Sequence, residues 1–226
     1  MKRVLLTSAG LLALAGLIGT ASAADLSRPP PYAPVKAPYA APVYNWTGFY
    51  AGINGGGAWG SSTWSGVPST FDVNGGMVGG QLGYNWQFGQ FVYGLEGDAD
   101  WAFLRGSTPG ALCVTCSTKS DFLATLRGRA GVAFDRFMPY VTGGLAVGNI
   151  RATAAALTGV DVTNAGWTVG GGIEFAIAGP WTAKVEYLYV DLGNTACGVA
   201  CGAPVGVANN VSLTENVVRA GINYRF

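Results

Sequence analysis

The sequence predicts an all-β protein, an eight-stranded antiparallel transmembrane β-barrel that follows a cleaved signal peptide and a proline-rich arm. Three observations lead to this prediction. Only 11% of the 226 residues are charged, against about 25% in soluble proteins. After Trp46, apolar residues alternate with polar or small ones, which is the period of a strand with one apolar face. The connections between these segments alternate between short and long, which is typical of membrane-spanning barrels.

Residues 1–23 have the pattern of a secretory signal peptide. Lys2 and Arg3 precede an apolar run over residues 4–18, and Ala21-Ser22-Ala23 supplies the small-x-small motif of a cleavage site. An uncleaved transmembrane anchor is the alternative, but the run is short for a membrane span. Loss of Lys2 and Arg3 would reduce the 13 basic residues to 11, against 12 acidic ones. This balance argues against a nucleic-acid partner, which needs a clustered basic surface.

Residues 24–45 are predicted to form a proline-rich periplasmic arm. Six prolines lie between Arg28 and Pro42. Because proline fixes φ and lacks a backbone donor, the arm should be extended. We expect a plain spacer, and the alternative is a docking strip for periplasmic envelope components.

The barrel is predicted over residues 46–226, where each strand is recognised by its apolar face. In chain order, the eight apolar faces consist of Phe49, Ala51 and Ile53; Val78, Leu82, Tyr84 and Trp86; Phe91, Tyr93, Leu95, Ala99 and Trp101; Phe122, Leu126, Ala130, Val132 and Phe134; Val141, Leu145 and Val147; Trp167, Val169, Ile173 and Phe175; Ala183, Val185, Tyr187 and Tyr189; and Val218, Ala220, Ile222, Tyr224 and Phe226. Strands of about 10 to 14 residues are long enough to cross a bilayer when tilted.

The predicted connections separate two ends of the barrel. Short turns are expected near residues 87–90, 135–138 and 177–180, and long links over residues 61–74, 105–119, 151–164 and 193–212. In outer-membrane barrels the short turns are periplasmic and the long loops extracellular.

The charged residues of the strands are predicted to point into the barrel. In the hydrocarbon region every backbone polar group needs a partner, so the sheet must close, and a charge facing lipid near the midplane costs about 2 to 4 kcal/mol. The predicted lumen network consists of Glu96, Asp98, Asp100, Glu174 and Glu186 with Arg127, Arg129, Lys184, Arg219 and Arg225. Because eight strands enclose a space that side chains can fill, we expect a salt-bridged plug. A narrow channel or a ligand site in the lumen is the alternative, and paired catalytic carboxylates are disfavoured because each acid has a basic neighbour.

No catalytic, cofactor or metal site is predicted. The chain contains no histidine, which excludes Ser/His/Asp and Cys/His catalysis, imidazole-bound zinc and haem held by a proximal histidine. The glycine runs lack the Gly-Lys-Ser/Thr ending and the following helix of a phosphate-binding loop. We therefore expect a protein that is not an enzyme.

Four cysteines lie in two of the predicted long links, as Cys113-x-x-Cys116 and Cys197-x-x-x-Cys201. An exported protein favours disulfides over free thiols, and three pairings are formally available. Two local pairs are the expected arrangement. A four-thiolate zinc site would need reduced thiols in an oxidising compartment.

Aromatic residues gather near the ends of the predicted strands. Amphipathic rings favour the level of lipid headgroups, so these residues predict two aromatic girdles. A carbohydrate-binding platform is the alternative, but the rings are spread over many strands. The residues are Trp46, Phe49, Tyr50, Trp86, Tyr93, Trp101, Tyr140, Trp167, Trp181, Tyr187, Tyr189 and Tyr224.

Several short motifs in order resemble one family over nearly the whole chain beyond the signal. They are Ala24-Asp25-Leu26, the proline-rich arm, the block from Trp46 to Gly52 (WTGFYAG), the segment from Leu126 to Gly131 (LRGRAG) and the terminal Tyr224-Arg225-Phe226. The sequence resembles the small outer-membrane β-barrel proteins of alphaproteobacteria, the 25/31 kDa outer-membrane immunogenic class, whose barrels are of the general type of the outer-membrane protein A transmembrane domain.

This resemblance implies a location in the outer membrane of a Gram-negative bacterium, among lipids and lipopolysaccharide. It implies an envelope component and surface antigen, with a narrow porin-like channel for small solutes as the alternative and haemin or other ligand binding by extracellular loops as the third. Phe226, with Tyr224 on the same face, looks like the signal by which the barrel-assembly machinery recognises the last strand of a client. The ligand, the oligomeric state and any conductance are left open.

Overall fold

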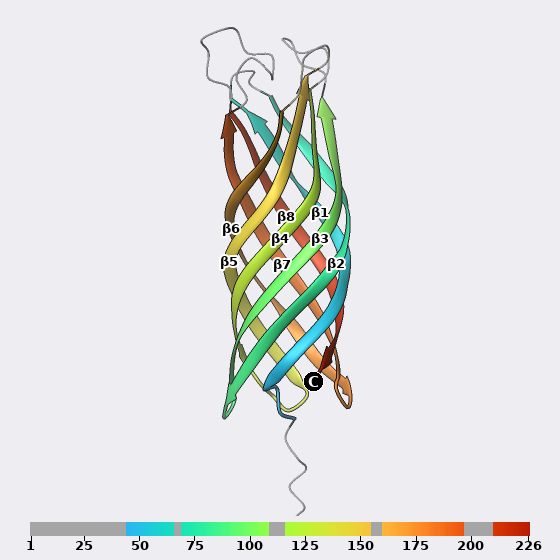
Figure 1. Cartoon of the computed structure of the whole chain (residues 1–226), viewed down its shortest axis with the longest axis vertical. Helices are drawn as coiled ribbons and strands as arrows, with labels where there is room; N and C mark the ends of the chain where they lie inside the picture. The colour runs from blue at the N-terminus through green and yellow to red at the C-terminus, as the bar shows by residue number, and fades with distance from the viewer. Residues whose placement is uncertain (1–43, 66–68, 109–115, 155–159, 197–209) are drawn as a thin grey trace, which may run out of the picture. The chain divides into compact units, whose positions relative to one another are not determined.

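The computed structural model describes residues 44–65, 69–108, 116–154, 160–196 and 210–226. These form a closed barrel in which each strand pairs with its neighbours in sequence and β8 returns to β1 (Figure 1). The strands are β1 (Gly48–Trp64), β2 (Ser69–Phe88), β3 (Phe91–Thr108), β4 (Cys116–Val132), β5 (Phe137–Ala154), β6 (Val160–Ala178), β7 (Trp181–Ala196) and β8 (Asn210–Arg225). All pairs are antiparallel, which confirms the predicted fold class.

Several predicted features lie outside the described residues. They are the signal peptide at residues 1–23, the arm up to residue 43, and Cys113, Cys197 and Cys201. Cys116 begins β4, and both disulfide pairings stay predictions. In the part of the chain that the structure describes, no helix has the length and apolar character needed to cross a bilayer.

The strands are longer than the sequence pattern predicted. They contain 16 to 20 residues, so the links between them are shorter than expected. The first predicted long link, residues 61–74, consists largely of strand, because β1 ends at Trp64 and β2 begins at Ser69.

Each strand continues past the point where its apolar residues move from the outward to the inward face, and the sequence pattern was read only up to that point. In β2, the apolar residues of the membrane region are even-numbered and exposed, as for Val78 and Leu82, whereas further up the strand they are odd-numbered and buried, as for Val73 and Met77. The period of two is kept while the apolar face moves from the outside to the inside. Above this change the outward residues of β2 are polar, such as Asn74 and Asp72, which indicates that the barrel wall continues beyond the hydrocarbon layer of the membrane.

Three tight turns mark the other end of the barrel. The turn after β2 contains Gly89 with φ of 62° and the turn after β6 contains Gly179 with φ of 52°, a backbone region that favours glycine. The third turn contains Asp135 with φ of 54° and is closed by a bridge between Phe134 and Phe137. Because the turns of outer-membrane barrels are short on the periplasmic side, this end is assigned as the periplasmic end. The start of β1 and the chain's C-terminus also lie here (Figure 1).

Candidate functional site

The barrel interior holds most of the charged residues of the strands. Nine of the ten residues predicted for the lumen network have at most 6% of their surface exposed. They are Glu96, Asp98 and Asp100 on β3, Arg127 and Arg129 on β4, Glu174 on β6, Lys184 and Glu186 on β7, and Arg219 on β8. We call these nine residues the lumen network.

Arg127 is the centre of the lumen network. Its guanidinium forms ion pairs with Glu96 at 2.6 Å, with Asp98 at 2.8 Å and with Glu186 at 2.9 Å. Its Nε also donates to the Thr125 hydroxyl at 2.8 Å. Because Glu186 lies on β7 and Arg127 on β4, this ion pair crosses the lumen between strands that are not neighbours in the sheet.

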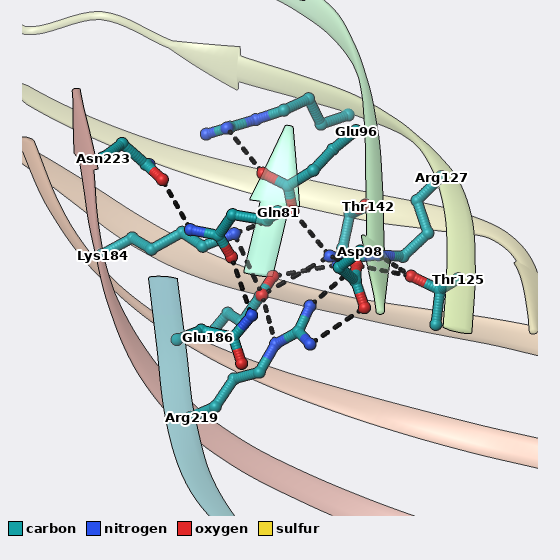
Figure 2. A network of polar contacts seen from close by, with 12 residues as sticks. Gln81, Glu96, Asp98, Thr125, Arg127, Thr142, Lys184, Glu186, Arg219 and Asn223 are labelled. Atoms are coloured by element: carbon teal, nitrogen blue, oxygen red, sulfur yellow. Dashed lines mark hydrogen bonds and ion pairs between the residues drawn. The ribbon is translucent and has the colours of Figure 1, made fainter. Parts of the chain in front are cut away.

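Two further cations join β7 and β8 to β3 across the interior (Figure 2). Lys184 Nζ lies 2.8 Å from Glu96 and 3.2 Å from Glu186. Arg219 binds Asp98 through Nη2 at 3.0 Å and Glu186 through Nε at 2.8 Å, and its Nη1 donates to Asp100. Such charge-assisted contacts in a poorly hydrated interior are strong only while every partner is present.

Arg129 occupies the periplasmic side of the lumen network. Its Nη2 lies 2.6 Å from Glu174, and its guanidinium carbon lies 4.1 Å from the centre of the Tyr140 ring. The Tyr50 hydroxyl accepts from Arg129 at 3.1 Å and donates to Glu96 at 2.7 Å. Two tyrosines predicted for the outer girdles therefore lie inside the barrel and bond to the charged residues.

Strand register explains how a simple alternating sequence builds this network. Glu96 on β3 lies directly opposite Arg127 on β4, and Glu186 on β7 lies directly opposite Arg219 on β8. Directly opposite side chains on one face are close enough to interact. The contacts that cross the lumen depend instead on the curvature and stagger of the closed barrel, so register along neighbouring strands does not reveal them.

Arg225 is the one predicted member that lies elsewhere. It ends β8 and is only half-buried, and its guanidinium stacks over the Tyr44 ring at 4.3 Å and donates to the backbone oxygen of Asn45. The alternation of β8 placed Arg225 on the inward face, but its position at the last residue of the strand puts it at the periplasmic rim. There it binds the segment that enters β1.

That entering segment closes the periplasmic mouth, which the sequence did not reveal. Trp46 is 1% exposed and packs in an apolar cluster with inward residues of the strand ends and turns, Val92, Ala133, Met138 and Ala176. Its indole N–H donates to the Asp135 backbone oxygen at 3.1 Å, and its backbone N–H donates to Gln87 Oε1 at 2.7 Å. Trp46 was predicted to be a girdle residue, but it lies inside the barrel. We call Trp46 and the four residues that pack with it the periplasmic cap.

The extracellular half of the interior contains an apolar core, among which a few buried polar side chains lie, such as the hydrogen-bonded Ser62 and Thr118. It is formed by buried residues that include Trp64, Phe71 and Met77 from the first two strands, Leu104 and Leu123 from the next two, and Ile150, Leu188, Leu192 and Leu213 from the later ones. The signal in the sequence is the change of apolar parity within the strands. From the periplasmic to the extracellular end, the interior thus contains the periplasmic cap, the lumen network and this apolar core, with further buried polar residues such as Gln81 and Asn223.

Glu215 is a buried acid outside the set of residues predicted for the lumen network. It is completely buried on β8, and neither carboxylate oxygen has a hydrogen-bond partner among the described residues. Along the inward face of β8 it lies between Leu213 of the apolar core and Arg219 of the lumen network. Glu215 is therefore the group in the interior whose burial is least compensated.

The outward surface carries the predicted girdles. At the periplasmic end, exposed rings include Trp86, Tyr93, Trp181 and Tyr224, and at the other end Trp59, Trp101 and Trp167. Between them the exposed residues are aliphatic, such as Leu82, Leu126 and Val185. This band matches the lipid-facing surface of an outer-membrane barrel.

The chemistry of the interior is that of packing and charge pairing. The lumen network holds five acids and four bases, and all of the bases pair with two or more acids. Within the described ranges, no group of three or more Cys, Asp or Glu side chains is placed to hold a metal ion.

Phe226, predicted for the assembly signal with Tyr224, is 80% exposed at the periplasmic rim, where its ring packs against Tyr224 at 5.3 Å.

Comparisons with known proteins agree with this architecture. A family model described as the outer membrane protein beta-barrel domain matches residues 10–226. The chain is 39% identical to the 31 kDa outer-membrane immunogenic protein of Brucella melitensis biotype 1, with both chains covered completely. It is 33% identical to the 25 kDa outer-membrane immunogenic protein of Brucella canis, covering all of this chain and 99% of that one. It is also 33% identical to the 22 kDa outer membrane protein of Rhizobium leguminosarum bv. viciae, covering 86% of this chain and 82% of that one.

Proposed function

Because the chain belongs to the outer membrane protein β-barrel family and resides in the outer membrane of a Gram-negative bacterium, we propose that it is a closed barrel with a structural and surface-interaction role. In this proposal it contributes to envelope integrity and presents its extracellular end as a surface antigen. It performs no catalysis. The relatives are named as immunogenic outer-membrane proteins, which supports the antigen role.

The observation that carries the proposal is the ion pair between Arg127 and Glu186 across the lumen, at 2.9 Å. A continuous water path would have to pass between side chains that already touch and are fully buried. The periplasmic cap and the apolar core lie on either side of this ion pair, so opening one layer alone would leave the interior closed. A narrow porin-like channel would therefore have to pass three constrictions, which are the periplasmic cap, the lumen network and the apolar core.

Solute efflux from liposomes tests the proposal. The chain is refolded into vesicles loaded with a small sugar or a small fluorescent anion, and efflux is compared with that from empty vesicles and from vesicles that contain a general porin. We expect efflux at the level of empty vesicles. Efflux that rises with the amount of protein would support the channel instead. Binding of antibodies against the loops to intact cells tests the antigen role separately.

A further inference from the structure

A row of outward-facing polar side chains crosses the extracellular end of five neighbouring strands. In the strand registers, Asn74 of β2 lies opposite Arg105 of β3, Arg105 opposite Lys119 of β4, Lys119 opposite Arg151 of β5, and Arg151 opposite Asp161 of β6. Arg105, Lys119 and Arg151 are cations, so three positive charges lie side by side on the barrel wall.

The charges in this row are compensated at one end only. Arg151 forms ion pairs with Asp121 at 3.0 Å and with Asp161 at 2.7 Å. Arg105 and Lys119 are exposed, and neither forms an ion pair within the part of the chain that the structure describes. Like charges that lie directly opposite on neighbouring strands destabilise a sheet. An anion bound between Arg105 and Lys119 would remove this cost.

The wall is hollowed at the same place. A surface cavity of about 470 Å³ is lined by Arg105 and Lys119 together with Asn74, Ser107 and Ser117. One acid, Asp72, also lines it. The cavity therefore offers two cations and several neutral hydrogen-bonding groups to a single anionic group, and Asp72 can accept from a hydroxyl of the same ligand.

The row lies just above the lipid-facing band. Trp101 and Phe103 on β3 are 67% and 57% exposed, and Phe122 on β4 is also exposed. Phe103 precedes Arg105 by two residues on the same face, which is about 7 Å along the strand. Aromatic residues of this kind mark the headgroup level, so Arg105 and Lys119 lie at the height of lipid headgroups.

We propose that Arg105 and Lys119 bind a phosphate group of an outer-leaflet phosphorylated glycolipid, the lipid A part of lipopolysaccharide, whose acyl chains lie along Trp101, Phe103 and Phe122. The combination of a dicationic cavity and an apolar wall directly beneath it fits a phosphorylated amphiphile. Arg and Lys are the side chains that bind phosphate oxygens most strongly. A free phosphate ion would use the cations but gain nothing from the apolar wall. The site is independent of whether the lumen is closed.

The test measures lipid binding to the full chain refolded in detergent micelles, by native mass spectrometry. The probes are bisphosphorylated lipid A and lipid A from which both phosphates have been removed, with inorganic phosphate as a competitor. The variant is Arg105→Gln with Lys119→Gln, which keeps polar side chains at both exposed positions. Arg136→Gln is the matched control, because Arg136 is an exposed cation in a periplasmic turn. Migration on SDS gels before and after boiling verifies that every variant is folded.

We expect bisphosphorylated lipid A to bind the double variant about 100-fold more weakly, which is about tenfold for each of the two cations replaced. The Arg136→Gln control should bind as the unchanged chain does, and the dephosphorylated lipid should bind the unchanged chain weakly. Equal binding by the double variant, or equal binding of the two lipids, would overturn the proposal. Complete displacement of the lipid by millimolar inorganic phosphate would also overturn it, because the site would then bind free phosphate.

Discussion

Arg127 of β4 and Glu186 of β7 form an ion pair at 2.9 Å through the middle of the barrel, although their strands are not neighbours in the sheet. Both side chains are completely buried, and each has further partners, so the pair connects two halves of the lumen network. This ion pair links the fold to the proposed function, because it joins opposite walls of the closed barrel and occupies the space that a solute would need.

The first prediction concerns removal of the central cation. Arg127→Ala leaves three carboxylates without their shared partner, which should lower the free energy of unfolding by about 3 to 5 kcal/mol. The measurement is urea unfolding in lipid vesicles. Arg151→Ala is the control, because it also removes an arginine with two acidic partners, but at an exposed site, where about 1 kcal/mol or less is expected. Equal losses for the two variants would contradict the structural account.

Two buried acids should respond oppositely to the same substitution. Glu186→Gln removes a carboxylate that has three cationic partners, so it should destabilise the barrel by about 3 kcal/mol or more. Glu215→Gln replaces a carboxylate with no partner among the described residues, so stability should stay the same or rise. The measurement is the urea midpoint of unfolding for both variants and the unchanged chain. A large loss of stability for Glu215→Gln would contradict the account, because it would show that the Glu215 carboxylate has a partner.

The periplasmic cap yields a third prediction. Trp46→Ala leaves a cavity in the cluster with Met138 and removes the hydrogen bond to Asp135, which should cost about 3 to 5 kcal/mol. Trp181→Ala is the matched control, since Trp181 is 48% exposed on the lipid-facing surface, and a smaller loss is expected there. If the two variants lost equal stability in urea unfolding, Trp46 would not be a packed component of the interior.

The sequence predicted the strand number, the antiparallel closure and the inward direction of nine charged side chains, because each follows from alternation and the cost of placing charge in lipid. It did not predict the strand lengths, since apolar residues such as Val73 and Leu213 change to the inward face beyond the membrane. The burial of Trp46 was not predicted, because the sequence does not distinguish a buried tryptophan from one at the membrane interface. The pairing of Arg127 with Glu186 depends on the three-dimensional closure of the barrel, which no local pattern records.

The assembly role of the C-terminal residue is a fourth prediction. Phe226 is 80% exposed and bonds to the sheet through its backbone N–H, which donates to the Phe49 oxygen at 2.9 Å. Phe226→Ala should therefore leave the stability of refolded barrel unchanged within about 1 kcal/mol, the range expected for an exposed side chain. In cells the same variant should reach the outer membrane in smaller amounts. Normal amounts in the membrane would refute an assembly signal at this residue.

Single-channel recording in planar lipid bilayers tests the closed barrel most directly. Refolded protein is added at fixed salt and voltage, with a general porin as the positive control and the Arg127→Ala variant beside the unchanged chain. The account predicts no steady conductance for the unchanged chain, and none for Arg127→Ala, because the cap and the apolar core still close the interior when the central cation is gone. A steady conductance in the nanosiemens range from the unchanged chain would contradict the closed barrel and establish the porin-like channel in its place.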